Sequence, residues 1–298
     1  DHIGHADTSM IGITIENSPA PIVLLTNPTP NSFIKDACPI TGKVQDDDLV
    51  CWVLSYGIGA SPTGWNKIDS ADYNFEGQFA LWDTKPLEDT SYTIKLWAID
   101  EIGRANETRT TITVDNTLPL ASIIEPQHEQ YIGGPIPIIG TASDKNFVDY
   151  VLEVGEGINP NFWVTIITGT EGVIEDTLGQ LSPLPGTGWW TVKLSVEDKA
   201  ENISRRQVSI IIDTLPPAPP TGLALQDSLQ QIILTWKPNT EPDLAGYNAY
   251  RQGSKINETT IPSPFYLDSV FVDGHYTYYV TALDQFDLES KPSDTVSI

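Results

Sequence analysis

Aspartate is the residue type in this chain whose spacing most suggests site chemistry. The 298 residues contain 40 Asp and Glu against 16 Lys and Arg, so the formal net charge is −24. Clustered carboxylates repel one another unless a cation joins them, and Ca²⁺ takes about six to eight oxygen ligands at roughly 2.3–2.6 Å. Three sets of acidic residues recur along the chain: Asp46, Asp48 and Asp100, with Glu16 as a further candidate; Asp115, Asp144 and Asp198; and Asp213, Asp243 and Asp284. Two interpretations stay open: each set binds Ca²⁺, or each Asp only caps a turn through its own backbone.

Residues suited to other kinds of chemistry do not fall into recognisable patterns. No Ser-His-Asp arrangement, Cys-His arrangement or pair of catalytic carboxylates can be identified. The pairs Gly57-x-Gly59 and Gly155-x-Gly157 lack the third glycine and the helix of a phosphate-binding loop. The histidines are scattered, with no Cys at metal-ligand spacing, and they are His2, His5, His128 and His275. The sequence therefore predicts no enzyme within these residues and no required cofactor.

The net charge also limits the partners of the chain. A protein this acidic repels the phosphates of nucleic acids and anionic membrane surfaces. No apolar run approaches the roughly 18 residues needed to cross a bilayer. We therefore expect no nucleic-acid partner and no membrane insertion by this segment.

Aromatic residues and glycosylation sequons offer further candidate sites. Trp97 lies on the outward face of a predicted strand, so it is the candidate contact residue for a partner such as a glycan. Trp65 and Trp163 occupy equivalent positions in two repeats, and each either forms a stacking platform for sugars or folds back over the open edge of a core. Possible glycosylation sites are Asn106, Asn202 and Asn257.

The two cysteines, Cys38 and Cys51, flank an acidic turn at unequal distances. If that turn joins neighbouring strands, the stagger between the cysteines is roughly 16 Å, whereas a disulfide tolerates at most ~7 Å between Cα atoms. We expect both thiols to be free.

These candidate residues must be positioned by β-strands, because one alternating pattern recurs. It occupies residues 92–100, 190–198 and 276–284, and large apolar residues alternate with smaller or polar ones up to a final Asp. The first two copies belong to units that match at an offset of 98 residues, as Gly42 and Gly140 illustrate. In the first unit we expect strands near 21–26, 38–45, 49–56, 65–69, 78–82, 91–99 and 108–115. Seven short strands in a unit of this length are typical of a β-sandwich.

Particular motifs extend this interpretation to known families. Trp236, Tyr247-x-x-Tyr250-Arg251 and the alternation from Tyr276 make residues 216–298 resemble a fibronectin type III domain. The two preceding units share the signature LSYGIGASPTGW at 54–65 and LEVGEGINPNFW at 152–163, and they resemble Ig-like repeats of large secreted bacterial proteins. The resemblance implies an all-β fold of tandem sandwiches that forms an elongated rod. The expected domains are a closing strand of a preceding Ig-like repeat at 1–18, Ig-like repeats at 19–116 and 117–215, and the fibronectin type III domain at 216–298.

This fold brings the acidic sets to particular places. In an Ig-like sandwich the loop after strand B, the loop after strand F and the incoming linker meet at one pole. Each acidic set is therefore expected at an interdomain joint, where bound Ca²⁺ would stiffen the connection. The isolated strand at 8–17 either completes a domain encoded by preceding residues or adds to the sheet of a neighbouring molecule.

The resemblance implies a non-catalytic structural or adhesive segment of a large extracellular bacterial surface or filament protein. Its expected partners are neighbouring copies of itself, other domains of the same longer chain, and glycans. The alternative is a set of accessory polysaccharide-binding or spacer modules of a secreted carbohydrate-active enzyme. Both functions place the chain outside the cell or at its surface.

Overall fold

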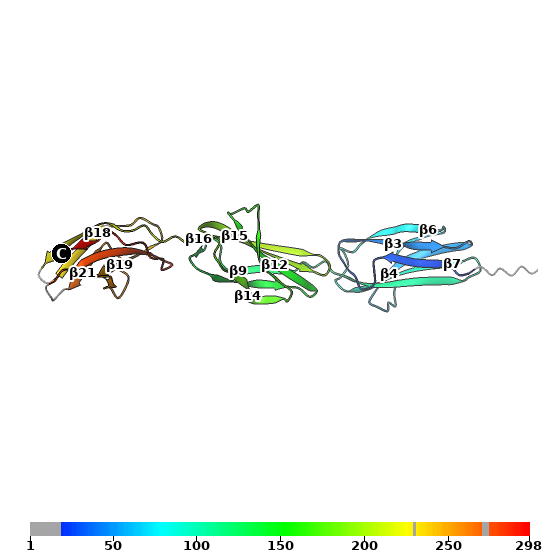
Figure 1. Cartoon of the computed structure of the whole chain (residues 1–298). Coiled ribbons are helices and arrows are strands. Elements are labelled where there is room, and N and C mark those ends of the chain that lie inside the picture. The colour runs from blue at the N-terminus through cyan, green and yellow to red at the C-terminus, as the bar shows by residue number, and fades with distance from the viewer. Residues whose placement is uncertain (1–18, 229–230, 270–273) are drawn as a thin grey trace, which may run out of the picture. The chain divides into compact units, whose positions relative to one another are not determined.

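The computed structural model describes residues 19–228, 231–269 and 274–298, and in these ranges the protein is all-β (Figure 1). They contain no helix long and apolar enough to cross a membrane. The chain forms two compact units, residues 19–119 with Glu197–Ile203 and residues Leu120–Val196 with Ser204–Ile298. The predicted closing strand at 1–18, with His2, His5 and Glu16, lies outside the described residues.

The first β-sandwich consists of a three-stranded and a five-stranded sheet. The smaller sheet has the order β1 (Ile22–Asn27), β3 (Ala37–Gln45), β6 (Phe75–Asp83). The larger sheet has the order β2 (Phe33–Ile34), β8 (Ala105–Val114), β7 (Ser91–Asp100), β4 (Leu49–Ile58), β5 (Asn66–Ala71). All seven predicted strands are confirmed, whereas the two-residue strand β2, which pairs in parallel with β8, was not predicted.

The second sandwich repeats this arrangement strand for strand. Its smaller sheet has the order β14 (Val173–Leu181), β11 (Ile136–Ser143), β9 (Leu120–Glu125). Its larger sheet has the order β10 (Tyr131–Ile132), β16 (Ile203–Ile212), β15 (Gly188–Asp198), β12 (Phe147–Glu156), β13 (Val164–Gly169).

The third sandwich keeps the strand order of the first two, but in the described residues it has no counterpart of the short strands β2 and β10. One sheet contains β17 (Thr221–Ser228), β18 (Gln231–Lys237) and β21 (Phe265–Ser269). The other contains β20 (Ser254–Lys255), β19 (Leu244–Arg251), β22 (Thr277–Asp284) and β23 (Val296–Ser297). The predicted all-β fold of tandem sandwiches is therefore confirmed.

The recurring alternating pattern forms an interior strand in every sandwich. β7 lies between β8 and β4, β15 between β16 and β12, and β22 between β19 and β23. In β7 the side chains of Tyr92, Ile94, Leu96 and Ala98 are buried, because a period of two residues directs every second side chain into the core. The aspartate that ends each of these strands is itself buried.

The cores of the first two sandwiches differ in composition although their strands correspond. The first core contains Trp52, whose ring meets that of Phe79 edge to face at 4.8 Å between centroids. The second core has Tyr150 at the position equivalent to Trp52, and the Tyr150 hydroxyl donates a hydrogen bond to the Leu178 carbonyl at 2.7 Å. Aromatic side chains thus contribute more to the first core, which buries Trp52, Phe79, Trp82 and Tyr92, than to the second, where aliphatic side chains surround the buried phenol of Tyr150.

Both sandwiches require glycine at one equivalent position because the backbones of paired strands approach closely. A Cβ at Gly42 would lie 2.0 Å from the Leu24 carbonyl oxygen, and a Cβ at Gly140 would lie 2.1 Å from the Ser122 carbonyl oxygen. Gly42 faces Leu25 in the β1–β3 pairing, so the close approach lies within the ladder itself.

Both cysteines are free, as expected. Their separation has a different cause from the one inferred from spacing. Cys38 lies in β3 and Cys51 in β4, and these two strands belong to different sheets rather than to one hairpin.

Candidate metal centre

Each interior strand ends at a buried aspartate whose carboxylate organises the following turn. Asp100, Asp198 and Asp284 are only 2%, 1% and 1% exposed. In every case Oδ1 accepts hydrogen bonds from the backbone N–H groups two and four residues later. The N···O distances are 3.1 and 2.7 Å at Asp100, 2.8 and 2.9 Å at Asp198, and 2.8 and 2.9 Å at Asp284. Each of these carboxylates therefore closes a turn through its Oδ1 atom.

The turn backbone is the same in all three copies. The N–H of each aspartate donates to the carbonyl four residues later, at 3.0, 3.2 and 3.2 Å. The residue three positions after the aspartate has a positive φ: 85° at Gly103, 63° at Glu201 and 62° at Asp287. Because the backbone is shared, differences in chemistry among the copies come from side chains alone.

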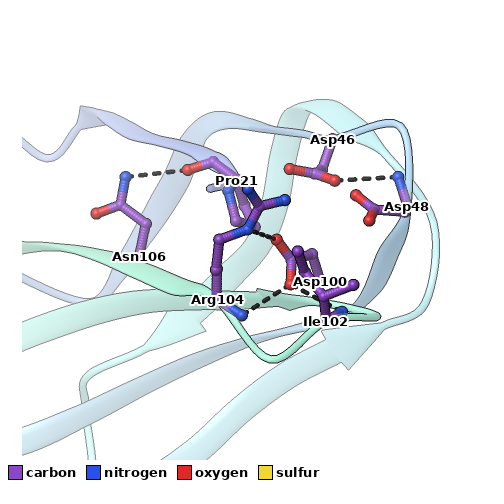
Figure 2. Close-up of polar contacts among 7 residues, drawn as sticks. All are labelled: Pro21, Asp46, Asp48, Asp100, Ile102, Arg104 and Asn106. Atoms are coloured by element: carbon purple, nitrogen blue, oxygen red, sulfur yellow. Dashed lines mark hydrogen bonds and ion pairs between the residues drawn. The ribbon is translucent and has the colours of Figure 1, made fainter. Parts of the chain in front are cut away.

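The first acidic cluster consists of Asp46, Asp48 and Asp100, and it lies within the first compact unit (Figure 2). One carboxylate oxygen from each residue lies within 4.8 Å of the others. The Asp48 N–H donates to Asp46 Oδ1 at 3.0 Å, which holds the loop that carries both residues. Arg104 Nε donates to Asp100 Oδ2 at 2.8 Å, so the first cluster contains its own cation.

The pKa values of Asp46 and Asp100 are shifted in opposite directions. Burial raises the pKa of Asp46 above its ordinary value, and the adjacent Asp48 carboxyl raises it further. Burial also acts to raise the pKa of Asp100, but hydrogen bonds from the Arg104 backbone and side chain outweigh it, so this pKa is lowered overall. Arg104 therefore stabilises the ionised form of Asp100 in particular.

The second predicted set is divided between the two compact units. Asp115 and Asp198 belong to the first unit, and Asp144 belongs to the second. The Asn202 side-chain amide donates to Asp198 Oδ2 at 2.9 Å and to the Asp115 carbonyl at 3.0 Å. Asp198 Oδ2 thus accepts a hydrogen bond from an uncharged amide, whereas Asp100 Oδ2 accepts one from the cationic Arg104 side chain.

The third acidic cluster consists of Asp213, Asp243 and Asp284, and it lies within the second compact unit. Its carboxylate oxygens also lie within 4.8 Å of one another. Burial raises the pKa of Asp243, and the neighbouring Asp213 and Asp284 carboxylates add to the rise. Among residues 19–228, 231–269 and 274–298, none of the three forms a salt bridge. Asp284 Oδ2 is buried and accepts no hydrogen bond in the described part of the chain.

The residue that distinguishes these turns follows each aspartate by four positions: Arg104, Asn202 or Leu288. Sequence reasoning singled out the aspartates but not these partners. The signal was available, because the three strand endings align and the residue type changes from cationic to amide to apolar at one position.

The predicted tryptophan sites are placed as follows. Trp97 is half-buried on the outer face of β7, between Val53 and Glu107 of the neighbouring strands. Trp65 does not cover the edge of the core, because its ring lies under Lys95 with Nζ 4.0 Å from the ring centroid. Lys193 lies over Trp163 at the same distance. The shared tryptophans therefore form cation–π contacts on the sheet surface, and contact of Trp97 with a partner stays a prediction.

The three sequons differ in accessibility. Asn106 is exposed, and its side-chain amide donates to the Pro21 carbonyl at 3.0 Å (Figure 2). Asn202 and Asn257 are 6% and 8% exposed, and the side-chain amide of each donates two hydrogen bonds to other residues of the protein. In the folded protein only Asn106 is positioned for modification among these three residues.

A segment of the chain resembles part of a known enzyme. No protein-family model matches the chain. A segment of 80 residues is 39% identical to a poly(3-hydroxybutyrate) depolymerase of Ralstonia pickettii, covering 26% of this chain. That segment spans 16% of the depolymerase, so most of the enzyme has no counterpart in this match.

Solved structures that resemble the chain are built from similar modules. A 1.5-MDa bacterial ice-binding adhesin matches with 16% identity and a TM-score of 0.38, over 94% of this chain and 98% of that one. The FN1–FN3 domains of chicken CNTN1 match with 14% identity and a TM-score of 0.38, over 94% and 97%. Fibronectin(III)-like modules of Clostridium thermocellum CbhA match with 15% identity and a TM-score of 0.35, over 65% and 95%.

Proposed function

We propose that this chain is a non-catalytic structural segment of a larger extracellular bacterial protein, in which consecutive sandwiches set the distance between functional parts. The observation that carries the proposal is the succession of three sandwiches that each enclose a separate hydrophobic core. The strongly acidic composition supports it, because net charge keeps such modules soluble and apart from one another. The domain limits predicted from the sequence, 19–116, 117–215 and 216–298, are part of the proposal.

Single-molecule force spectroscopy of the chain between two handles tests this function. Independent load-resisting modules unfold one at a time, so we expect three force peaks. Each peak should release roughly 27–36 nm of contour length, from about 83–99 residues at roughly 3.3–3.6 Å per residue. Extension without discrete peaks would contradict a structural role, because the modules would then bear no load.

An accessory role in a polymer-degrading enzyme is the second candidate. The observation that favours it is the 39% identity with a segment of the depolymerase. Incubation of the chain with cellulose, chitin and poly(3-hydroxybutyrate) particles separates the candidates. A structural segment stays in the supernatant, whereas an accessory module binds one polymer saturably.

A tryptophan comparison makes this binding test specific. If Trp97 is the contact residue, Trp97→Ala abolishes polymer binding while Trp65→Ala, at another partly buried surface tryptophan, retains it. Release of soluble products by the isolated chain would refute the non-catalytic part of the proposal. An adhesive role, with glycans or neighbouring copies as partners, is a variant that the same particles and a self-association measurement address.

A further inference from the structure

Asp284 Oδ2 is a buried carboxylate oxygen without a hydrogen-bond partner in the described part of the chain, so it is a candidate ligand for a cation. Asp284 is 1% exposed and its Oδ1 already accepts two backbone hydrogen bonds, whereas Oδ2 accepts none from the residues that the structure describes. A buried carboxylate oxygen without a partner is strongly destabilising, because the charge has lost its hydration without compensation. Here the carboxylates of Asp213 and Asp243 approach the same point, which adds repulsion. A cation at this point would compensate all three groups.

In the turns after Asp100 and Asp198, a side chain of the protein donates a hydrogen bond to the equivalent carboxylate oxygen. At Asp100 the second carboxylate oxygen accepts from the Arg104 guanidinium, which Figure 2 shows beside the converging carboxylates. At Asp198 it accepts from the Asn202 amide. At Asp284 the equivalent residue is Leu288, which has neither a charge nor a donor. The turn backbone is the same in the three copies, so the third lacks only the side-chain partner.

We propose that Asp213, Asp243 and Asp284 bind a Ca²⁺ ion, and that Arg104 takes the place of such an ion in the first cluster. Such an ion site can occur in a structural segment and in an accessory module alike. Oxygen-only ligands favour a hard cation over zinc or copper. Carboxylates from a linker, a loop and a strand end suit the flexible coordination of Ca²⁺ better than the near-ideal octahedron that Mg²⁺ demands.

Calorimetric titration of the whole chelator-treated chain with CaCl2 tests the assignment, with MgCl2 as the comparison ion. Asp284→Asn is the primary variant, because an Asn side-chain oxygen can still accept from the Phe286 and Leu288 amides and so preserves the turn. We expect it to weaken Ca²⁺ binding by roughly tenfold or more, since affinity follows the number of charged ligands. Asp100→Asn is the matched control in the first cluster and should leave Ca²⁺ binding unchanged.

Exchange of the distinguishing residues gives a reciprocal test. Leu288→Arg should abolish this Ca²⁺ site by supplying an internal cation, whereas Leu288→Met, which adds neither charge nor donor, should retain it. Arg104→Leu should add one Ca²⁺ per chain by removing the internal cation from the first cluster. Circular dichroism identifies any variant that fails to fold, and the Leu288 pair decides the question if Arg104→Leu does so.

The outcomes are distinct. Loss of one Ca²⁺ equivalent in Asp284→Asn and Leu288→Arg, but not in Asp100→Asn or Leu288→Met, supports the assignment. Wild-type protein that takes up no Ca²⁺ below about 5 mM, beyond the usual range of extracellular modules, would overturn it. An equal number of Ca²⁺ ions bound with equal affinity by wild type and Asp284→Asn would also overturn it, as would an unchanged number of bound Ca²⁺ ions in Leu288→Arg.

Discussion

Replacement of Gly42 by alanine should destabilise the first sandwich strongly although it adds a single methyl group. The added Cβ would lie 2.0 Å from the Leu24 carbonyl oxygen and 3.0 Å from the Leu24 carbonyl carbon. Carbon–oxygen contacts in sheets are about 3.3–3.6 Å, so the two backbones must separate by more than about 1 Å. The obstacle is the backbone of β1, which cannot rotate away as a side chain would. The β1–β3 ladder must therefore open at the Leu25–Gly42 pair.

The expected loss of stability combines two effects. Overpacking in a close-packed region costs about 1–3 kcal/mol, and each backbone hydrogen bond that is lost adds about 0.5–1.5 kcal/mol. We expect a decrease of about 2–4 kcal/mol in the free energy of unfolding. For a domain of this size, each kcal/mol lowers the melting temperature by about 4–8 °C, so the transition should fall by roughly 8–30 °C.

Thermal and urea denaturation followed by tryptophan fluorescence measures this change, because Trp52 and Trp82 are buried in the first core. Gly64→Ala is the matched control, since its Cβ would meet no atom within 4 Å. The free energy of unfolding of that variant should equal that of wild type or exceed it by up to about 1 kcal/mol. Gly140→Ala should lower the transition of the second sandwich and leave the first unchanged. If Gly42→Ala and Gly64→Ala unfold together, the steric argument is wrong.

Three further predictions concern charge, aromatic contacts and thiols. The pKa of Asp243 is raised in the folded protein, so native Asp243 holds its proton more tightly than the unfolded chain does. With chelator present, the free energy of unfolding should therefore fall as pH rises from about 4 through that pKa. Asp243→Asn should remove this pH dependence, and a difference in free energy of unfolding between wild type and Asp243→Asn that is constant between pH 4 and 7 would contradict it. In urea titrations, Trp65→Ala should lose about 1 kcal/mol, mainly from the Lys95 contact, whereas Trp52→Ala should lose about 3–5 kcal/mol from the core; equal losses would refute this division. A thiol reagent should modify half-buried Cys51 before Cys38, which is buried and has a pKa raised by that burial, and labelling in the reverse order would exclude this placement.

The strands were predictable because alternation and turn residues are local signals. Residues 92–100 form an interior strand as expected, since every second side chain is apolar and the chain leaves the sheet at Asp100. The strand Phe33–Ile34 was not predictable in this way. It has two residues and pairs in parallel with Thr113–Val114, far along the chain, so neither its period nor its partner is visible locally.

The site was predictable in part for a similar reason. Spacing identified Asp213, Asp243 and Asp284. Whether Asp284 Oδ2 accepts a hydrogen bond, however, depends on which side chain of the following turn folds back against it. The contact of Trp65 with Lys95 likewise depends on sheet register, because Ser55 of β4 pairs with Lys95 while Tyr56 pairs with Asn66, next to Trp65. Such cross-strand neighbours follow from topology rather than from sequence spacing.

The difference in composition between the first two cores has a consequence for how neighbouring domains fold. Neighbouring domains with equivalent strands are prone to exchange them during folding, which traps misassembled forms. A strand carrying Trp52 does not fit the space that Tyr150 and Leu178 fill, and the reverse exchange leaves a void against Phe79. Each core thereby rejects the strands of its neighbour, since close-packed interiors penalise both excess and missing volume. The difference in core composition therefore disfavours misfolded forms in which neighbouring sandwiches exchange strands.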